Sequence, residues 1–209
     1  MNQPSVGTTL DVQSFINTQP LSRYQWRVVI LCFLIVFLDG LDTAAMGFIA
    51  PALSQDWGID RASLGPVMSA ALIGMVFGAL GSGPLADRFG RKVVLVGAVL
   101  VFGAFSLASA YSTTVDQLLV LRFLTGLGLG AGMPNATTLL SEYTPERHKS
   151  LLVTSMFCGF NLGMAGGGFI SAKLIPAFGW HSLLLIGGIL PLILAVVLLV
   201  WLPESARYL

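Results

Sequence analysis

Residues 38–44 read Leu-Asp-Gly-Leu-Asp-Thr-Ala, and they place two carboxylic acids inside an apolar run from Val28 to Leu53. That run is long enough to cross a bilayer, which takes about 20 helical residues. A charged side chain at the centre of a membrane span costs at least about 2.5 kcal/mol, so such residues normally face a partner or a water-filled cavity. Asp39 and Asp42 share one helix face because they are three residues apart. We therefore expect the rest of the chain to supply a cavity and a partner charge.

The overall composition is that of an integral membrane protein. Of the 209 residues, 55% are hydrophobic and only 10% are charged, whereas soluble domains carry about 25% charged residues. The net charge of +1 and the lack of a basic patch with interleaved aromatic residues give no sign of nucleic-acid binding. Cys32 and Cys158 lie in apolar runs, which favours buried apolar residues over a disulfide or a metal site. We expect no metal and no cofactor.

Six segments are long and apolar enough to be transmembrane helices, the only structure apart from a closed barrel that satisfies the backbone in lipid. They are predicted at about 27–50, 62–83, 93–111, 117–140, 151–174 and 182–202. The expected organisation is a cytoplasmic arm at 1–26, a six-helix unit at 27–202 and the start of a cytoplasmic connector at 203–209.

The positions of Lys and Arg predict the orientation of these spans. If the N-terminus is inside, the outer loops hold only Arg61 and Lys173, and Arg122 falls within the fourth span. This bias is typical of a cytoplasmic N-terminus, so we expect a multi-pass protein of the cytoplasmic (inner) membrane. The basic residues on the cytoplasmic side are Arg23, Arg27, Arg88, Arg91, Lys92, Arg147, Lys149 and Arg207.

The spans form two triplets with the same order of character. The first and fourth spans hold intramembrane charges and glycines, the second and fifth carry a small residue at every fourth position, and the third and sixth are uncharged. Three helices out and three back predict an all-α fold with a 3+3 inverted repeat, a common plan of secondary transporters. We expect the uncharged spans to be lipid-facing supports. The small residues are Ala70, Gly74, Gly78 and Ser82 in one row and Ser155, Gly159, Gly163, Gly167 and Ser171 in the other.

Such small-residue rows let helix backbones approach closely. Nothing else in the sequence is recognisable as the partner of these rows, so we expect them to meet helices that are not part of this chain.

Asp42 and Arg122 are predicted to lie at similar depths in the membrane. Counting 1.5 Å per residue from the outer span ends puts them roughly 12 Å and 8 Å below the surface. They are within side-chain reach if the first and fourth spans are neighbours. A buried acid beside a guanidinium stays ionised, and it can take a proton once the pair separates. The alternatives are a substrate carboxylate held by the arginine fork and a static ion pair that fixes helix packing.

Several motifs resemble one known family. Residues 83–92, Gly-Pro-Leu-Ala-Asp-Arg-Phe-Gly-Arg-Lys, resemble the loop signature of the major facilitator superfamily. Residues 122–130 resemble its fourth-helix motif, and residues 141–147 its cytoplasmic Glu-x-x-Pro-x-x-Arg pattern with the arginine one residue early. Residues 202–209 resemble the end of the sixth helix in sugar porters and aromatic acid symporters. Residues 39–44 are most similar to the aromatic acid/H+ symporter family.

The resemblance implies alternating access by the rocking of two six-helix halves, of which this chain is the N-terminal one. Asp87 is expected to contact the missing C-terminal half near the inside surface and to stabilise the outward-open state. Arg88 and Arg91 are expected to pair with Glu142 and Glu204 in a cytoplasmic charge network. The residues assigned to gating are Gly83, Asp87, Arg88, Gly90, Arg91, Glu142, Arg147 and Glu204.

The resemblance also implies a transport site, with protons and a small aromatic carboxylate as its cargo. Arg122 and Asp42 are expected to be the proton-linked pair, and Asp39 is expected to shape the aromatic-acid site. Asn135 and Asn161 lie at membrane depth, where each could bind a substrate or a neighbouring helix with equal chance.

Three other functions remain open at this point. One is a sugar or other organic-acid symporter of the same superfamily, the second is a drug exporter, and the third is a membrane scaffold that transports nothing. An enzyme is not expected, because the sequence has no nucleophile–base pair, phosphate loop or metal-ligand cluster.

Overall fold

The computed structural model of the chain describes residues 21–202 and contains six long helices in this part. All six are long and apolar enough to cross a membrane, so the protein is a multi-pass integral membrane protein. Residues 1–20 and 203–209, which hold most of the predicted arm and connector, lie outside the described residues. The elements are α2 (Arg23–Trp57), a 3-10 turn η1 (Arg61–Leu64), α3 (Gly65–Phe89), α4 (Arg91–Ser109), α5 (Val115–Tyr143), α6 (Glu146–Phe178) and α7 (His181–Trp201).

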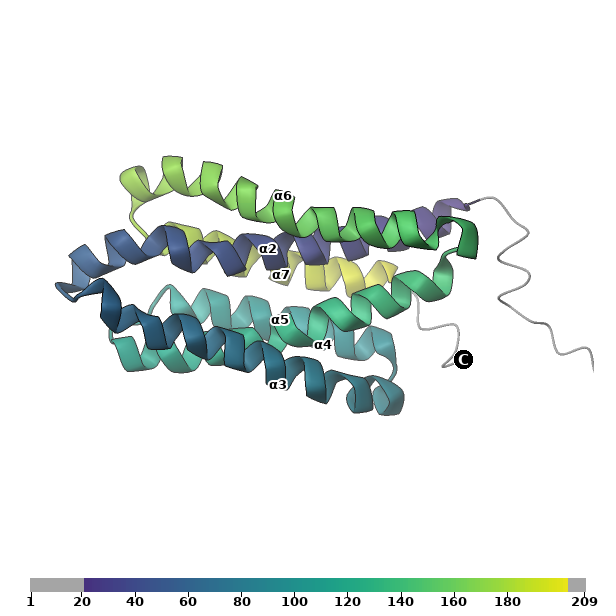
Figure 1. Cartoon of the computed structure of the whole chain (residues 1–209), viewed down its shortest axis with the longest axis horizontal. Helices are drawn as coiled ribbons and strands as arrows, with labels where there is room; N and C mark the ends of the chain where they lie inside the picture. Colours follow the sequence, from purple (N-terminus) through teal and green to yellow (C-terminus); the bar gives the residue numbers. More distant parts are fainter. Residues whose placement is uncertain (1–20, 203–209) are drawn as a thin grey trace, which may run out of the picture.

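The helices run antiparallel to their sequence neighbours along the long axis of the molecule (Figure 1). We call the end where α2 begins the Arg91 end and the opposite end the Trp180 end. At the Arg91 end, Ser22 and Gln25 form a capping box on α2, which satisfies backbone N–H groups that have no partner in the first turn. At the Trp180 end, the Trp180 indole N–H donates to the Asp56 carboxylate at 3.0 Å, joining the start of α7 to the end of α2.

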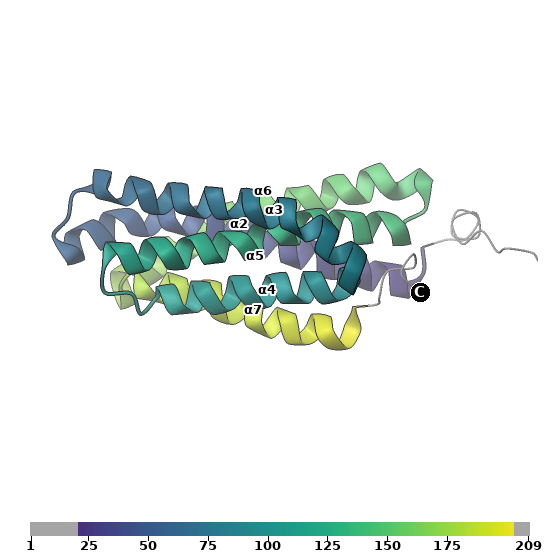
Figure 2. The ribbon, with the colours of Figure 1, turned by 90° about the horizontal axis from the view of Figure 1, so that it is seen from below.

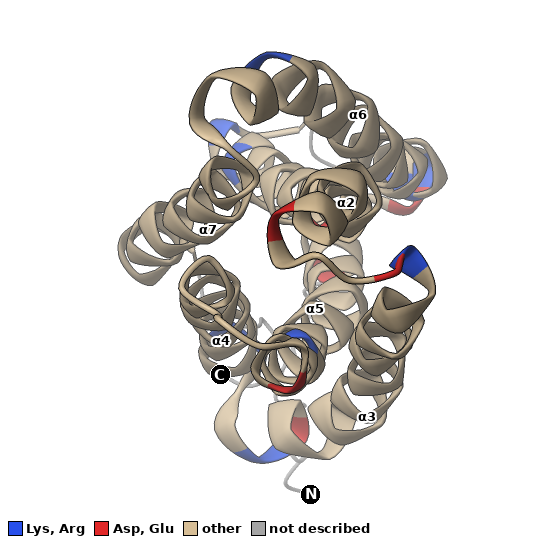
Figure 3. Cartoon of the chain, turned by 90° about the vertical axis from the view of Figure 1, so that its left-hand side faces the viewer, with Lys and Arg blue, Asp and Glu red and all other residues tan. Residues whose placement is uncertain are grey.

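The packing exchanges helices between the two predicted triplets. Helices α3 and α4 of the first triplet pack mainly on α5 of the second, while α6 packs mainly on α2 of the first. Figure 2 shows α5 between α3 and α4, and Figure 3 shows the resulting groups α3–α5–α4 and α6–α2–α7 end-on. Contacts of α4 with α7 and of α2 with α5 join the groups. This symmetry confirms the 3+3 inverted repeat.

The two rows of small residues are used inside the chain. A β-carbon added to Gly78 of α3 would overlap the backbone carbonyl of Leu127 in α5, and one added to Gly163 of α6 would overlap that of Phe37 in α2. The expectation that these rows await helices outside this chain is therefore wrong. A row of small residues indicates that another helix can approach closely, but it does not identify which helix packs there.

The alternating glycines of α5 face two different helices. Gly126 and Gly130 lie against the backbone of α3, whereas Gly128 lies against Ala98 and Phe102 of α4. Residues two apart on an α-helix point in nearly opposite directions because each residue turns the helix by about 100°. Alternation thus lets one helix approach neighbours on both sides.

The expectation that the third and sixth spans are only lipid-facing supports is wrong in part. Helices α4 and α7 pack on each other, and each has a buried face, for example Val99 and Leu198, opposite exposed residues such as Val93 and Val200. The least buried spans are instead those of α3 and α6. Uncharged helices can still contribute a core face, because apolar residues serve equally well against lipid and against protein.

We predict that Gly78→Ala destabilises the protein and that Gly81→Ala, one turn further along α3, does not. The methyl group of an alanine at position 78 would force α3 and α5 apart, at a cost of about 1–3 kcal/mol. A β-carbon on Gly81 would meet open space. Thermal unfolding of the purified protein in detergent measures the difference. Equal unfolding temperatures for the two variants would contradict the close approach of α3 and α5.

Candidate functional site

A buried ion pair joins the two helices that carry charge inside the membrane. The Nη1 atom of Arg122 in α5 lies 3.0 Å from Oδ2 of Asp42 in α2, and their side chains are 1% and 3% exposed. The similar depths inferred from the sequence therefore correspond to a real contact. Breaking such a pair from one side is costly because it leaves an uncompensated charge in a low-dielectric interior.

Two serines of α4 complete the hydrogen bonding of this pair. The Ser106 hydroxyl donates to Oδ1 of Asp42 at 2.6 Å and accepts from Nη2 of Arg122 at 3.3 Å. The Ser109 hydroxyl accepts from Nε of Arg122 at 3.3 Å. All three guanidinium nitrogens therefore have a partner. Gly187 of α7 closes the far side, where a β-carbon would lie 3.3 Å from Oδ1 of Asp42.

Ser106, Ser109 and Gly187 were not predicted as site residues from the sequence. Serine and glycine are common in transmembrane helices, and serine often bonds to its own backbone there, so neither residue type indicates a site by itself. One signal was present. An arginine inside a membrane span needs several acceptors, and the facing α4 offers these two hydroxyls.

Asp39 is also buried, at 3% exposure, one helical turn before Asp42. It accepts a hydrogen bond from the Thr43 hydroxyl at 3.3 Å within α2. This hydrogen bond of Asp39 therefore involves neither Asp42 nor Arg122.

The ion pair forms part of the wall of a cavity. This cavity has a volume of about 200 Å³ between α2, α3 and α5, and it is lined by Asp42, Arg122 and three methionines, Met46, Met68 and Met75. A second, open cavity of about 580 Å³ between α3, α5 and α6 shares Met75 and Leu129 with the first. We call the two together the trough. Its second part is lined by Met75, Val76, Ala79, Leu129, Gly130, Met133, Pro134, Thr137, Thr138 and Phe157.

The two asparagines predicted as site residues are not brought together with the ion pair. Asn135 is buried, and its side-chain amide donates to the Ala131 carbonyl in its own helix at 2.8 Å. Asn161 is exposed on α6.

A second ion pair lies at the Arg91 end. Nε of Arg91 is 3.0 Å from Oε1 of Glu142, whose side chain is only 5% exposed. This is one of the pairings that the family resemblance implied. The Arg88 guanidinium lies over the Phe89 ring at 5.4 Å, Arg147 is exposed in the first turn of α6, and Glu204 is outside the described residues.

The turn between α3 and α4 differs from the expected loop. Residues 83–89 form the last two turns of α3, Pro84 included, and the chain reverses at Gly90 alone, with φ 86°. Asp87 is therefore exposed in the last turns of α3 and does not lie in a loop. The single residue suffices because glycine readily adopts positive φ. A β-carbon on Gly83 would meet open space.

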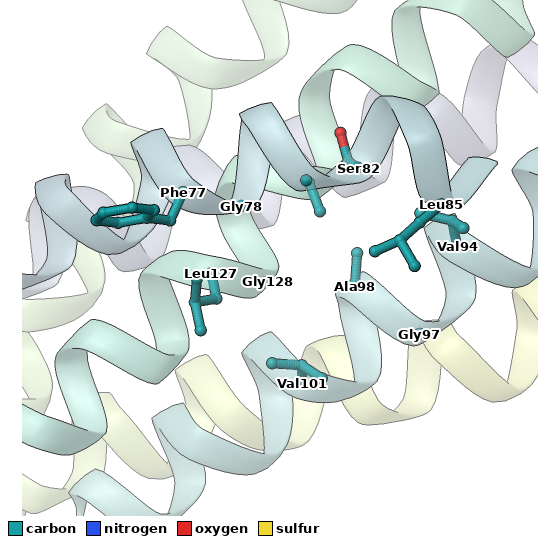
Figure 4. Close-up of a pocket in the computed structure, with 12 residues that line it drawn as sticks. Phe77, Gly78, Ser82, Leu85, Val94, Gly97, Ala98, Val101, Leu127 and Gly128 are labelled. Atoms are coloured by element: carbon teal, nitrogen blue, oxygen red, sulfur yellow. The ribbon is translucent and has the colours of Figure 1, made fainter. Parts of the chain in front are cut away.

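A separate groove, with a volume of about 390 Å³, lies between α3, α4 and α5, and Figure 4 shows the residues that line it. Its lining is almost entirely apolar and includes Phe77, Leu85, Val94 and Val101. No charged residue lines it, so it suits hydrocarbon rather than a charged ligand, and we do not include it in the site.

Comparisons with known proteins agree with these features. The profile of the Major Facilitator Superfamily matches residues 32–208. A 4-hydroxybenzoate transporter, PcaK, of Pseudomonas putida is 91% identical over 207 residues, which cover 99% of this chain and 46% of that protein. A gallate transporter of the same species is 56% identical, covering 100% of this chain and 46% of that protein. A benzoate transport protein of Acinetobacter baylyi is 38% identical, covering 96% and 44%. The chain thus spans about half the length of the curated relatives it matches.

Solved structures show the same fold at low sequence identity. A D-xylose-proton symporter matches with a TM-score of 0.77 and 21% identity, covering 88% of this chain and 50% of that one. The xylose transporter XylE from E. coli in an inward-open conformation matches with a TM-score of 0.76 and 20% identity, covering 88% and 49%. At these identities the likeness concerns the fold alone.

We predict that Arg122→Met destabilises the protein by about 3–5 kcal/mol, because it leaves the Asp42 carboxylate buried without its cation. Adding Asp42→Asn to this variant should restore most of the loss, since the remaining groups are neutral. Thermal unfolding of the single and double variants measures the coupling. Strictly additive losses would show that the two side chains do not depend on each other.

Proposed function

We propose a function for this chain from one premise: the chain belongs to the Major Facilitator Superfamily. Its fold is one half of a major facilitator fold, with six transmembrane helices in a 3+3 inverted repeat. We propose that it is the N-terminal half of a secondary active transporter that imports a small aromatic carboxylate with protons by alternating access. The names of the relatives support this substrate class, because they specify 4-hydroxybenzoate, gallate and benzoate.

The observation that carries the proposal is the Asp42–Arg122 pair in the wall of the trough. While Asp42 is ionised, it is the counter-ion of Arg122. A proton on Asp42 removes that charge, and the guanidinium then needs another anion, which a substrate carboxylate can supply by accepting hydrogen bonds from the planar arginine fork. Proton binding and carboxylate binding would therefore favour each other, as symport requires.

The rest of the trough fits an aromatic ring better than a sugar. Its lining is mostly apolar, with Thr43, Thr137 and Thr138 as its few hydroxyl groups. Met46, Met68 and Met75 offer flexible thioethers, which make favourable contacts with aromatic rings. A hexose would leave most of its hydroxyl groups without partners, and each unsatisfied buried polar group costs about 1–3 kcal/mol.

The Arg91 end is proposed to be the cytoplasmic gate. Exposed Asp87 is available to a second six-helix half, while the Arg91–Glu142 pair holds the start of α4 to the end of α5. Gly90 makes the sharp turn between α3 and α4, and Gly83, Arg88, Arg147 and Glu204 are proposed as further parts of the gate. Contact of Asp87 with the second half would favour the outward-open state.

The orientation and the partner follow from the same reasoning. Most Lys and Arg residues of the described helices lie at the Arg91 end, which supports a cytoplasmic N-terminus in an inner membrane. A C-terminal six-helix half would close the open side of the trough. Asp39, Asn135 and Asn161 are proposed as secondary contributors to the transport site.

A sugar or other organic-acid symporter is the nearest alternative, and the two are separated by uptake competition. Benzoates should compete with labelled 4-hydroxybenzoate in vesicles, whereas hexoses should not. A scaffold that transports nothing would show no uptake at all, and an exporter would show accumulation in the opposite direction.

We predict that Asp42→Asn in the full-length transporter abolishes proton-driven accumulation but keeps some substrate binding. The amide resembles the protonated acid in shape and charge, yet it can no longer release a proton. Uptake of labelled 4-hydroxybenzoate into vesicles with an imposed pH gradient, with and without an uncoupler, measures accumulation. Asp116→Asn, an exposed acid in the first turn of α5, is the matched control and should accumulate normally. Wild-type accumulation by Asp42→Asn would refute the role of Asp42.

We predict that Asp87→Asn slows transport about tenfold or more and changes the affinity for substrate by less than about threefold, because Asp87 lies far from the trough at the Arg91 end. A loss of about 1.4 kcal/mol in the stability of one state corresponds to such a tenfold change. Separate measurement of the maximal uptake rate and of the substrate concentration at half-maximal rate distinguishes the two. A large loss of affinity would argue against gating, and Glu146→Gln, an exposed acid at the same end, serves as control.

A further inference from the structure

We propose that Ser106 is a positioning residue that keeps the carboxyl group of Asp42 hydrogen-bonded in both of its protonation states. The inference rests on the proposed function of the Asp42–Arg122 pair. It assigns a direct part in proton coupling to α4, whose stretch from Val93 to Ser109 carries no charged residue.

Ser106 bridges the two members of the ion pair. Its hydroxyl is 0% exposed, donates to Oδ1 of Asp42 at 2.6 Å and accepts from Nη2 of Arg122 at 3.3 Å. The bond to Asp42 is the shortest contact made by either charged group in the site. Hydrogen bonds to an ionised partner are roughly twice as strong as those between neutral groups.

Ser109, one turn along the same helix, has a different role. Its hydroxyl hydrogen is donated to the Phe105 carbonyl at 2.7 Å, so this serine offers Arg122 only a lone pair. Ser106 instead directs its hydrogen to the carboxylate. The two serines are equally buried, and they differ in whether they touch the acid.

The surroundings leave Asp42 no partner on the α7 side that could replace Ser106. A β-carbon on Gly187 would lie 3.3 Å from Oδ1 of Asp42 and 3.4 Å from the Ser106 hydroxyl, so that side is closed. The opposite side of the pair opens into the trough through Asp42 and Arg122. A proton and a substrate would therefore arrive from the trough, while Ser106 holds the carboxyl group from behind.

A hydroxyl group can serve both protonation states without moving the helix. With Asp42 ionised, the Ser106 O–H donates to Oδ1. When a proton binds to Oδ1, that new O–H donates to the Ser106 oxygen, which has two lone pairs and retains the bond from Arg122. The Ser106 hydrogen then turns to a backbone carbonyl of the preceding turn of α4, the kind of bond that Ser109 already makes. No proton leaves Ser106 in this exchange.

Few other titratable groups can account for a pH response at this position. Helix α2 contributes Asp42 and Asp39, and α5 contributes Arg122. The stretches of α4 and α7 that pack around Ser106 carry no charged residue between Val93 and Ala110 or between Leu183 and Leu202.

The test compares Ser106→Ala with Ser109→Ala in the full-length transporter. Uptake of labelled 4-hydroxybenzoate into vesicles is measured as a function of pH with the gradient held constant. Ser106→Ala removes a hydrogen bond from both protonation states of Asp42, and the bond to the ionised carboxylate is the stronger of the two. Protonation therefore becomes easier, and the midpoint at which uptake falls on the alkaline side moves up by about one pH unit. Ser109→Ala lowers the rate through Arg122 but leaves the midpoint in place. Ser106→Thr, which retains the hydroxyl, returns the midpoint toward wild type.

An unchanged midpoint in Ser106→Ala, or an equal shift in Ser109→Ala, overturns the proposal. If Ser106→Ala does not reach the membrane, Ser106→Cys carries the test, because the thiol is similar in size but a weaker donor and should shift the midpoint in the same direction by less. Failure of the proposed function looks different, since the wild-type protein would then not take up the aromatic acid at any pH.

Discussion

The structure depends on satisfying one guanidinium group inside a membrane. Arg122 is almost completely buried, and its three nitrogens find partners on two other helices, Asp42 on α2 and two serines on α4. Gly187 brings α7 against the same carboxylate. Helices α2, α4, α5 and α7 therefore meet around one polar cluster. A charged group without a partner would be too costly to keep in hydrocarbon.

The close packing of the helices holds the Asp42–Arg122 pair in the middle of the bundle. Helices α2 and α5 carry the charges, and glycines let α6 approach α2 closely and let both α3 and α4 approach α5 closely. This arrangement puts the polar helices in the middle of their groups and leaves α3 and α6 as the most exposed spans. Helices α4 and α7 close one side of the ion pair and the trough opens on the other side, so the proposed transport site is accessible from the trough.

Much of this could be predicted from the sequence. Six spans, the inverted repeat and the pairing of Asp42 with Arg122 followed from hydropathy, periodicity and the cost of buried charge. The serines on α4 could not be singled out, because Ser106 and Ser109 look like ordinary residues of an apolar helix. The partners of the small-residue rows were misassigned, since Gly78 or Gly163 shows where a neighbour fits without naming it. The predicted second span ended at residue 83, whereas α3 continues to Phe89. Proline often ends a helix, but Pro84 lies within α3.

The alternating glycines of α5 impose a fixed length on this part of the chain. Gly126 and Gly130 serve α3, Gly128 serves α4, and Arg122 precedes them on the same helix. Insertion or deletion of a single codon between positions 122 and 130 would turn everything beyond it by about 100° and misalign both glycine faces with respect to the arginine. We therefore expect this segment to tolerate substitutions far more readily than changes in its length.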